Sequence, residues 1–91
     1  MTDKKMLIGS LSNDLFRVAS LAHRGSKKAT DKFWKESKRW VVELSNYELD
    51  SYIEDIIFDL KADEAVTISQ EKAEKLLMYS VLLQNYSLHL V

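Results

Sequence analysis

The sequence has no cysteine and no proline, and only two glycines among its 91 residues. Without cysteine the chain has neither disulfides nor thiolate metal sites, so packing must hold the fold, as suits a cytoplasmic protein. Two glycines supply too few turns for a mostly β protein and too few of the glycine-rich loops that hold phosphates in many enzymes. We therefore expect an all-α chain, and residues 1–91 suffice for a single helical domain.

Long apolar runs are also missing. The run Met6–Ile8 is far shorter than the apolar core of a signal peptide. The longest apolar region, from Leu76 to Val91, is shorter than the roughly 18 residues that span a bilayer, and it includes Gln84 and Asn85. We expect no export signal, no membrane span and a cytoplasmic location.

Apolar residues recur with the period of an α-helix in four segments. The first predicted helix starts at about Leu7 or Ser10 and ends at Arg24, because Gly25 suits the position after a helix end. Ser26 can cap a second helix. The expected inward residues are Leu7, Ile8, Leu11, Leu15, Val18, Ala19 and Ala22 in the first helix, and Ala29, Phe33, Ser37, Trp40, Val41 and Leu44 in the second.

A third helix is predicted to begin at Ser45, because Ser45 and Glu48 match a capping box. Its apolar arc differs in phase from that of residues 29–44 by roughly 150° at 100° per residue, so one straight helix cannot direct both arcs inward. A single kinked helix through Ser45 and Asn46 is the alternative. The expected inward residues are Leu49, Tyr52, Ile53, Ile56, Ile57 and Leu60.

The segment from Asp63 to Ile68 is expected to connect to a last helix, which Thr67 or Ser69 caps and which extends nearly to Val91. Its expected core arc is Ala73, Leu76, Leu77, Ser80, Leu83 and Ser87. Four amphipathic segments with short connections predict an antiparallel up-down four-helix bundle. Three helices with a long kinked second helix are the alternative.

The net charge of −1 hides an uneven distribution. Residues 17–39 hold eight basic and two acidic side chains, giving +6, whereas residues 40–91 hold three basic and ten acidic ones, giving −7. A stripe on the second helix could bind nucleic acid or another polyanion, with Trp34 stacking on a base at its edge. Alternatively, the acidic third helix faces this stripe within the fold or across a dimer. The stripe consists of Lys27, Lys28, Lys32, Lys35, Lys38 and Arg39, and the cations predicted to bind the polyanion are Lys28, Lys32, Lys35 and Arg39.

Candidate catalytic and metal-binding groups are few. Glu71 and Glu74 resemble half of a magnesium-binding acidic cluster, but no acidic residue follows them to complete it. Neither His23 nor His89 has a glutamate three residues before it, which excludes the di-iron pattern of helical bundles. We therefore predict no catalytic residue, no metal, no cofactor and no enzymatic activity.

The last helix carries more apolar residues than one buried face requires. Its opposite side has Met78 and Leu82, and tyrosines flank them. Either the other three helices wrap around this helix, or the surplus is an interface with a second copy or a helical protein partner. A weaker stripe lies on the charged side of the third helix. The interface residues predicted are Met78, Tyr79, Leu82, Tyr86, Phe58 and Tyr47.

Overall fold

The computed structural model describes residues 3–64 and 67–90 and contains four helices in that part of the chain. They are α1 (Lys4–His23), α2 (Lys27–Leu44), α3 (Ser51–Ala62) and α4 (Gln70–His89). The predicted all-α four-helix class is confirmed. Residues 45–50 separate α2 from α3, so the alternative with one long kinked second helix is not formed.

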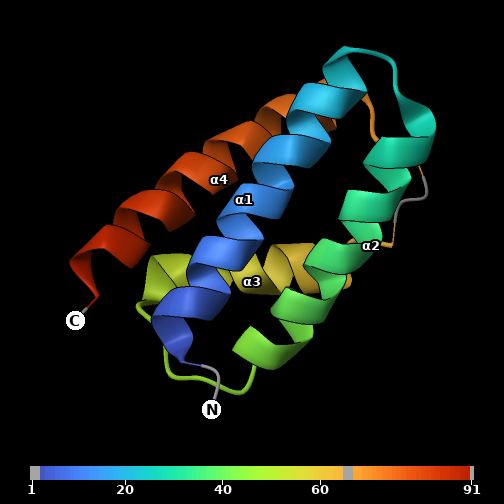
Figure 1. The fold of residues 1–91 in the computed structure, drawn as a ribbon. Helices are drawn as coiled ribbons and strands as arrows, with labels where there is room; N and C mark the ends of the chain where they lie inside the picture. Colours follow the sequence, from blue (N-terminus) through green and yellow to red (C-terminus); the bar gives the residue numbers. More distant parts are fainter. Residues whose placement is uncertain (1–2, 65–66, 91) are drawn as a thin grey trace.

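α1 packs against α2 along most of its length, and the two helices are antiparallel (Figure 1). Trp40 Nε1 donates to Asp14 Oδ2 at 2.8 Å. One turn further along α1, the guanidinium of Arg17 lies 5.3 Å from the ring centroid of Phe33. Later residues of α1 thus meet earlier residues of α2, as antiparallel packing requires.

α4 packs on another side of α1 and also runs antiparallel to it (Figure 1). The Ser12 hydroxyl donates to the Ser80 carbonyl at 2.7 Å. Nearer the start of α1, a Cβ at Gly9 would lie 3.8 Å from the hydroxyl of Ser87. α1 therefore forms the centre of the bundle, with α2 and α4 as its two long neighbours.

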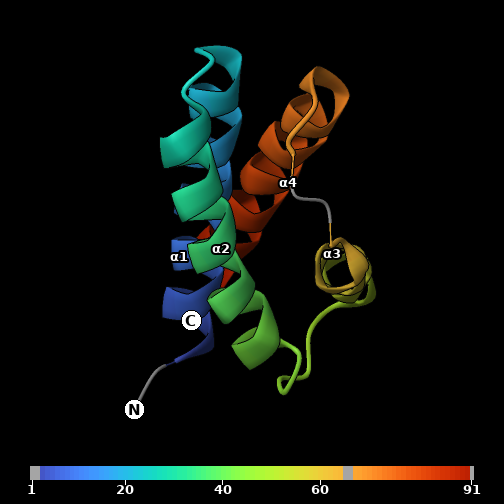
Figure 2. The ribbon, with the colours of Figure 1, turned by 90° about the vertical axis from the view of Figure 1, so that its right-hand side faces the viewer.

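α3 is shorter and inclined to the other helices, and Figure 2 shows it almost end-on while α1 and α2 run from top to bottom of the picture. Its contacts with α4 follow an antiparallel order. The Tyr52 ring at its start lies edge-on to Tyr86, and Asp59 near its end bonds to Tyr79. The predicted up-down order of the bundle is present, with α3 tilted out of line.

α1 begins three residues before Leu7, because the side chain of Asp3 accepts a hydrogen bond of 2.7 Å from the Met6 amide. Gly25 has φ of 78°, the left-handed conformation expected after a helix end. Ser26 flanks α2 as predicted, but its backbone carbonyl, rather than its side chain, accepts from Thr30.

The predicted capping box at Ser45 is wrong. Ser45 is the last, flanking residue of α2, and its hydroxyl donates back to the Val42 carbonyl at 2.6 Å. α3 starts only at Ser51, where the Asp50 carbonyl accepts from the Ile53 amide at 2.9 Å. Residues 45–50 change the direction of the chain, so that α3 lies at an angle to α2.

The start of α4 agrees with the prediction, since the side chain of Ser69 accepts from the Lys72 amide at 3.1 Å. The helix ends at His89, and Val91 lies outside the described residues. So do residues 65 and 66 of the predicted connection.

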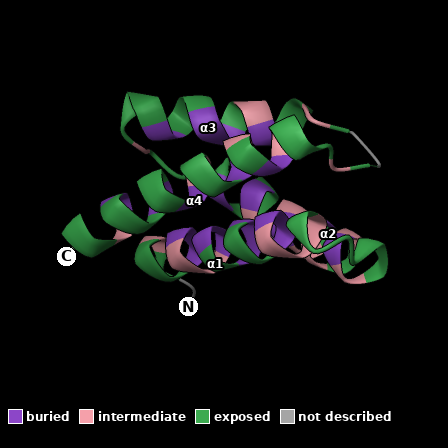
Figure 3. Cartoon of the chain, turned by 90° about the horizontal axis from the view of Figure 1, so that it is seen from above, coloured by how far each residue is buried: buried purple, intermediate pink, exposed green. Residues whose placement is uncertain are grey.

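The buried side chains of all four helices form one cluster, seen as the purple inner surfaces in Figure 3. The predicted arcs of α1 and α3 are largely confirmed, although Ala22 is half-buried and Tyr52 is exposed. In α2 the buried side of the helix is rotated from the predicted side by about half of the 100° that separates successive residues. Thr30 and Trp34 are buried, and Phe33 and Trp40 are half-buried.

α4 is also turned relative to the prediction. Tyr86 is buried, whereas Leu77 is exposed and Ser87 is half-buried. Ala73, Leu76, Ser80 and Leu83 are buried as expected. This small rotation decides which apolar residues of α4 remain at the surface.

Candidate functional site

The side of α4 that points away from α1 and α3 is apolar and exposed. The apolar members of this surface are between 36% and 67% exposed, so α4 is not the wrapped, central helix of the bundle. Figure 3 shows the corresponding exposed segments along α4. We call this surface the outer face of α4, and it consists of Leu77, Met78, Val81, Leu82, Asn85 and Leu88.

The outer face of α4 also has almost no charge. No Asp, Glu, Lys or Arg occurs after Lys75, although such residues make up 30% of the chain. Surface helices normally carry charge on the side that faces water. Cores of protein interfaces are instead depleted of charge and enriched in residues such as methionine.

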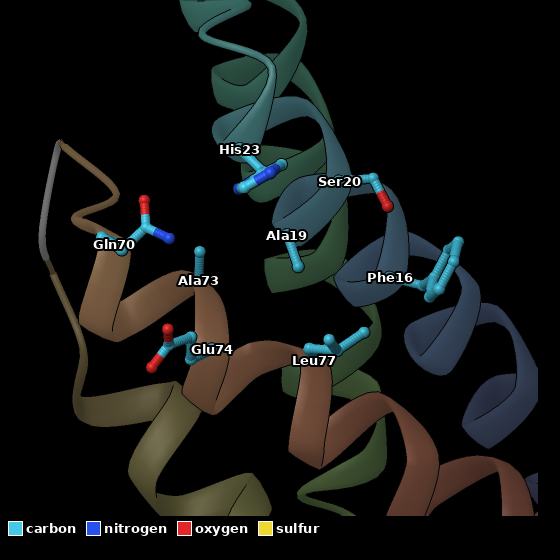
Figure 4. Close-up of a pocket in the computed structure, with 8 residues that line it drawn as sticks. All are labelled: Phe16, Ala19, Ser20, His23, Gln70, Ala73, Glu74 and Leu77. Carbon is cyan, nitrogen blue, oxygen red and sulfur yellow. The ribbon is translucent and has the colours of Figure 1, made fainter.

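A groove of about 330 Å³ lies beside the first half of the outer face, between α1 and α4 (Figure 4). Ala19 and Ala73 form part of its lining, and their small side chains leave space where the two helices face each other. Phe16 and Leu77 border one end, whereas His23 and Gln70 lie toward the other (Figure 4). An apolar side chain is the ligand that such a lining suits.

The two predicted interface tyrosines of α4 are not on its outer face. Tyr86 is only 8% exposed and packs edge-on against Tyr52 at 6.0 Å between ring centroids, so its expected place on an exposed stripe is wrong. Tyr79 is half-buried, and its hydroxyl donates to Asp59 at 2.6 Å. Burial and this hydrogen bond raise the pKa of Tyr79 to about 12. Met78 and Leu82 are exposed as predicted.

Phe58 and Tyr47 are exposed, Phe58 by 74%, but they belong to another surface. They line a groove of about 320 Å³ between α3 and the residues that precede it. Glu54 and Lys61 border this groove, and no residue of α4 lines it. The structure therefore separates the predicted interface residues into two regions.

The cationic stripe of α2, defined as Lys28, Lys32, Lys35 and Arg39, is exposed along its whole length. Among the described residues none of these four forms an ion pair. Asp59 of α3 lies 3.0 Å from Lys75 of α4, and Asp63, which follows α3, is paired with Lys72. In the part of the chain that the structure describes, these four cations do not pair with α3, whereas Lys38, expected in the same stripe, bonds to the end of α3.

Trp34 cannot stack on a nucleic-acid base in this conformation, because it is only 5% exposed. The ammonium of Lys38 lies 4.7 Å from the centroid of its ring, and that of Lys72 lies at 5.6 Å. Lys38 also donates to the carbonyls of Leu60 and Asp63 at the end of α3. Burial lowers the pKa of Lys38, and the residue joins α2 to α3 rather than extending the exposed stripe.

The buried polar side chains of the described residues all have hydrogen-bond partners. Burial raises the pKa of Asp14, although the hydrogen bond from Trp40 opposes this shift. Within residues 3–64 and 67–90 no three His, Asp or Glu side chains gather as a metal site. In the same part of the chain no helix has the length and apolar character needed to cross a membrane.

Comparison with known protein families, curated proteins and solved structures finds no match to this chain. Function must therefore be argued from the surfaces themselves. Sequence reasoning missed four residues of the region around α4, namely Phe16, Leu77, Val81 and Leu88. The uncharged stretch after Lys75 was the signal that could have found three of them.

Proposed function

We propose that this protein is a non-catalytic helical module that oligomerises through the outer face of α4. The observation that carries the proposal is the apolar, uncharged surface of a helix that is already packed on its other side. Exposed apolar patches of this kind usually mark sites of association. The proposed location is the cytoplasm, because a fold without cysteine has no disulfide that would need an oxidising compartment.

The shifted ionisable groups support a structural role for the polar network. Asp14 bonds to Trp40, Asp59 bonds to Tyr79, and Lys38 bonds to the end of α3. Each of these groups thus has a partner that joins two helices. This arrangement favours a module that acts by binding rather than by proton transfer.

The proposal is tested by placing two carboxylates on the outer face, as Met78→Asp together with Leu82→Asp. Both residues are exposed, so helical circular dichroism should be retained. The mass measured by light scattering should fall to that of one chain. The matched control is Val42→Asp, an exposed apolar residue of α2, which should leave the mass unchanged. An unchanged mass in the double variant contradicts the proposal.

A second candidate function is polyanion binding through the cationic stripe of α2. It is favoured by four exposed cations spaced along one helix face without ion pairs among the described residues. Such a surface binds phosphates by releasing their counterions. Binding of labelled RNA and DNA at two salt concentrations tests this candidate.

Affinity for either nucleic acid should fall steeply with salt and should be lost in Lys32→Glu with Lys35→Glu. Lys61→Glu on α3 changes one exposed lysine elsewhere and serves as the control. Absence of binding at low salt would exclude polyanion binding through α2 and leave oligomerisation through α4 as the proposed function.

A further inference from the structure

We infer that the partner of the outer face of α4 is a second copy of α4 lying antiparallel to it, with Glu74 of each copy opposite Asn85 of the other. This inference rests on the proposed oligomerisation and specifies its geometry.

A line of residues along α4 has the spacing of a helix–helix seam. Glu74, Met78, Val81, Asn85 and Leu88 recur at intervals of 4, 3, 4 and 3. This alternation keeps one side of a helix against a partner helix, as in coiled coils. All five residues are exposed in the single chain, so a second helix can reach the whole line.

Two copies of α4 can lie side by side in opposite directions over their full length. α4 extends from Gln70 to His89, which at 1.5 Å per residue is about 30 Å. In the register that uses its full length, Gln70 lies opposite His89 of the second copy. The same register sets Met78 opposite Val81 and Glu74 opposite Asn85, and it sets Leu88 opposite Glu71 at the end of the seam.

Charge decides between the antiparallel and the parallel orientation. In a parallel pair Glu74 would face Glu74 of the second copy, and Glu71 would face its own counterpart. In the antiparallel pair each Glu74 carboxylate can accept a hydrogen bond from the side-chain amide of Asn85. Antiparallel helices also place opposite ends of their dipoles side by side. Only the antiparallel orientation separates the carboxylates of Glu71 and Glu74 in one copy from those in the other.

The groove beside α1 lies where the antiparallel pair needs it. Leu88 is the most exposed apolar residue of α4, and it follows Gln70 by 18 residues, which is five full turns. Both side chains therefore leave α4 on the same flank, and Gln70 lines the groove. A twofold axis perpendicular to the helices keeps this flank on the same side in both copies. Leu88 of the second copy then lies over the end of the groove that Gln70 and His23 border.

The orientation is tested by giving Asn85 a charge of either sign. Asn85→Lys should tighten the dimer, because two ion pairs with Glu74 form at the interface, and roughly a three- to tenfold lower Kd is expected. Asn85→Glu should weaken it, because two carboxylates then face each other twice. Val42→Lys and Val42→Glu are the matched controls on α2 and should leave Kd unchanged. Sedimentation equilibrium measures each Kd.

The outcomes separate this inference from the proposed function. If both Asn85 variants weaken a dimer that the unmodified chain forms, like residues face each other and the pair is parallel. If neither variant changes Kd, Asn85 lies outside the contact, and the antiparallel seam is overturned while association stands. If the unmodified chain and both variants remain single chains, the proposed function itself fails.

Cross-linking gives an independent reading, because the chain has no native cysteine. A mixture of Glu74→Cys and Asn85→Cys chains, treated with a short thiol-specific cross-linker, should give mainly mixed dimers. Each variant alone should give little product. Predominant dimers of like variants would overturn the antiparallel arrangement.

Discussion

α2 and α4 both pack against α1, yet their outer sides differ completely. α2 turns its apolar residues inward except for Val42, and it exposes Lys28, Lys32, Lys35 and Arg39. α4 buries one side as well and exposes a second side that is apolar and uncharged. α2 thus has the apolar inner side and charged outer side that are typical of a surface helix in a single chain.

The difference shows that the single chain leaves a continuous apolar surface exposed on the outer face of α4. Both helices gain stability from their inner sides, so burial alone does not explain the composition of α4. A residue on the outer face of α4 gains contacts only when another molecule covers it. We therefore attribute the inner side of α4 to folding and its outer side to association.

The sharpest test of this division compares two neighbouring leucines of α4. Leu76 is 0% exposed and Leu77 is 41% exposed. Leu76→Ala should lower the free energy of unfolding by about 2–5 kcal/mol through lost burial and a cavity. Leu77→Ala should lower it by about 1 kcal/mol or less at protein concentrations too low for association. Equal losses in urea denaturation would mean that α4 is enclosed on both sides.

On the side of α2, the contact between Trp40 and Asp14 should have the next largest effect. Trp40→Phe removes the indole donor and leaves a buried carboxylate without it, which should cost about 1–3 kcal/mol. Urea denaturation of this variant, Asp14→Asn and the double variant gives the coupling between the two side chains. Additive losses would show that the hydrogen bond does not join α1 to α2.

The buried Asp14 should also give the α1 and α2 pair a pH dependence. Burial raises the pKa of Asp14 above 3.8, so the folded chain holds this proton more tightly than the unfolded chain. Its contribution to stability should therefore fall as pH rises from about 4 through the folded pKa. Asp14→Asn should remove this component from urea midpoints measured across that range. A variant profile parallel to the native one would contradict the assignment.

The α3 flank of α4 should depend on a weaker polar contact. Tyr79→Phe loses the hydrogen bond to Asp59 and should cost about 1 kcal/mol. The pKa of Tyr79 is raised from 10.0 to about 12, so its stabilising contribution is present below pH 10 and is lost as pH rises to about 12. Asp59→Asn should lower the pH at which ultraviolet absorbance detects this phenolate. No shift would exclude the pairing.

The two glycines should give the smallest effects, of opposite sign. Gly9 faces α4 within α1, and a Cβ there makes an ordinary contact of 3.8 Å with Ser87. Gly9→Ala should therefore stabilise the fold by about 0.5–1 kcal/mol. Gly25 precedes α2 with φ of 78°, so Gly25→Ala should destabilise it by about 1 kcal/mol. Thermal unfolding of the two variants checks the contrast.

The sequence predicts these elements best where polar residues mark the outer side clearly. α1 carries Asn13 and Arg17 opposite its apolar arc, and its buried apolar residues are those predicted apart from Ala22, although Ser12 and Asp14 are buried as well. α2 has Phe33, Trp34 and Trp40 spread over a wide arc, so periodicity alone cannot decide which ring is buried. The structure buries Trp34 beneath Lys38 of α2 itself and Lys72 of α4, and the contact with α4 cannot be read from the periodicity of α2.

The candidate site is harder to predict for the same reason. α4 is apolar around most of its circumference, so either Leu77 or Tyr86 could complete its buried arc. The structure buries Tyr86, which packs against Tyr52 of α3. The local signature at Ser45 misplaces the start of α3, because Ser45 bonds back to α2. Local patterns identify the helices, whereas the tilt of α3 and the rotation of α4 depend on tertiary contacts.

The most direct test of the account is the mass of the unmodified chain in solution. Sedimentation velocity over a wide range of protein concentration should show a shift from 10.6 kDa to twice that mass, because the outer face of α4 then becomes covered. A mass of 10.6 kDa at every concentration would contradict association through α4.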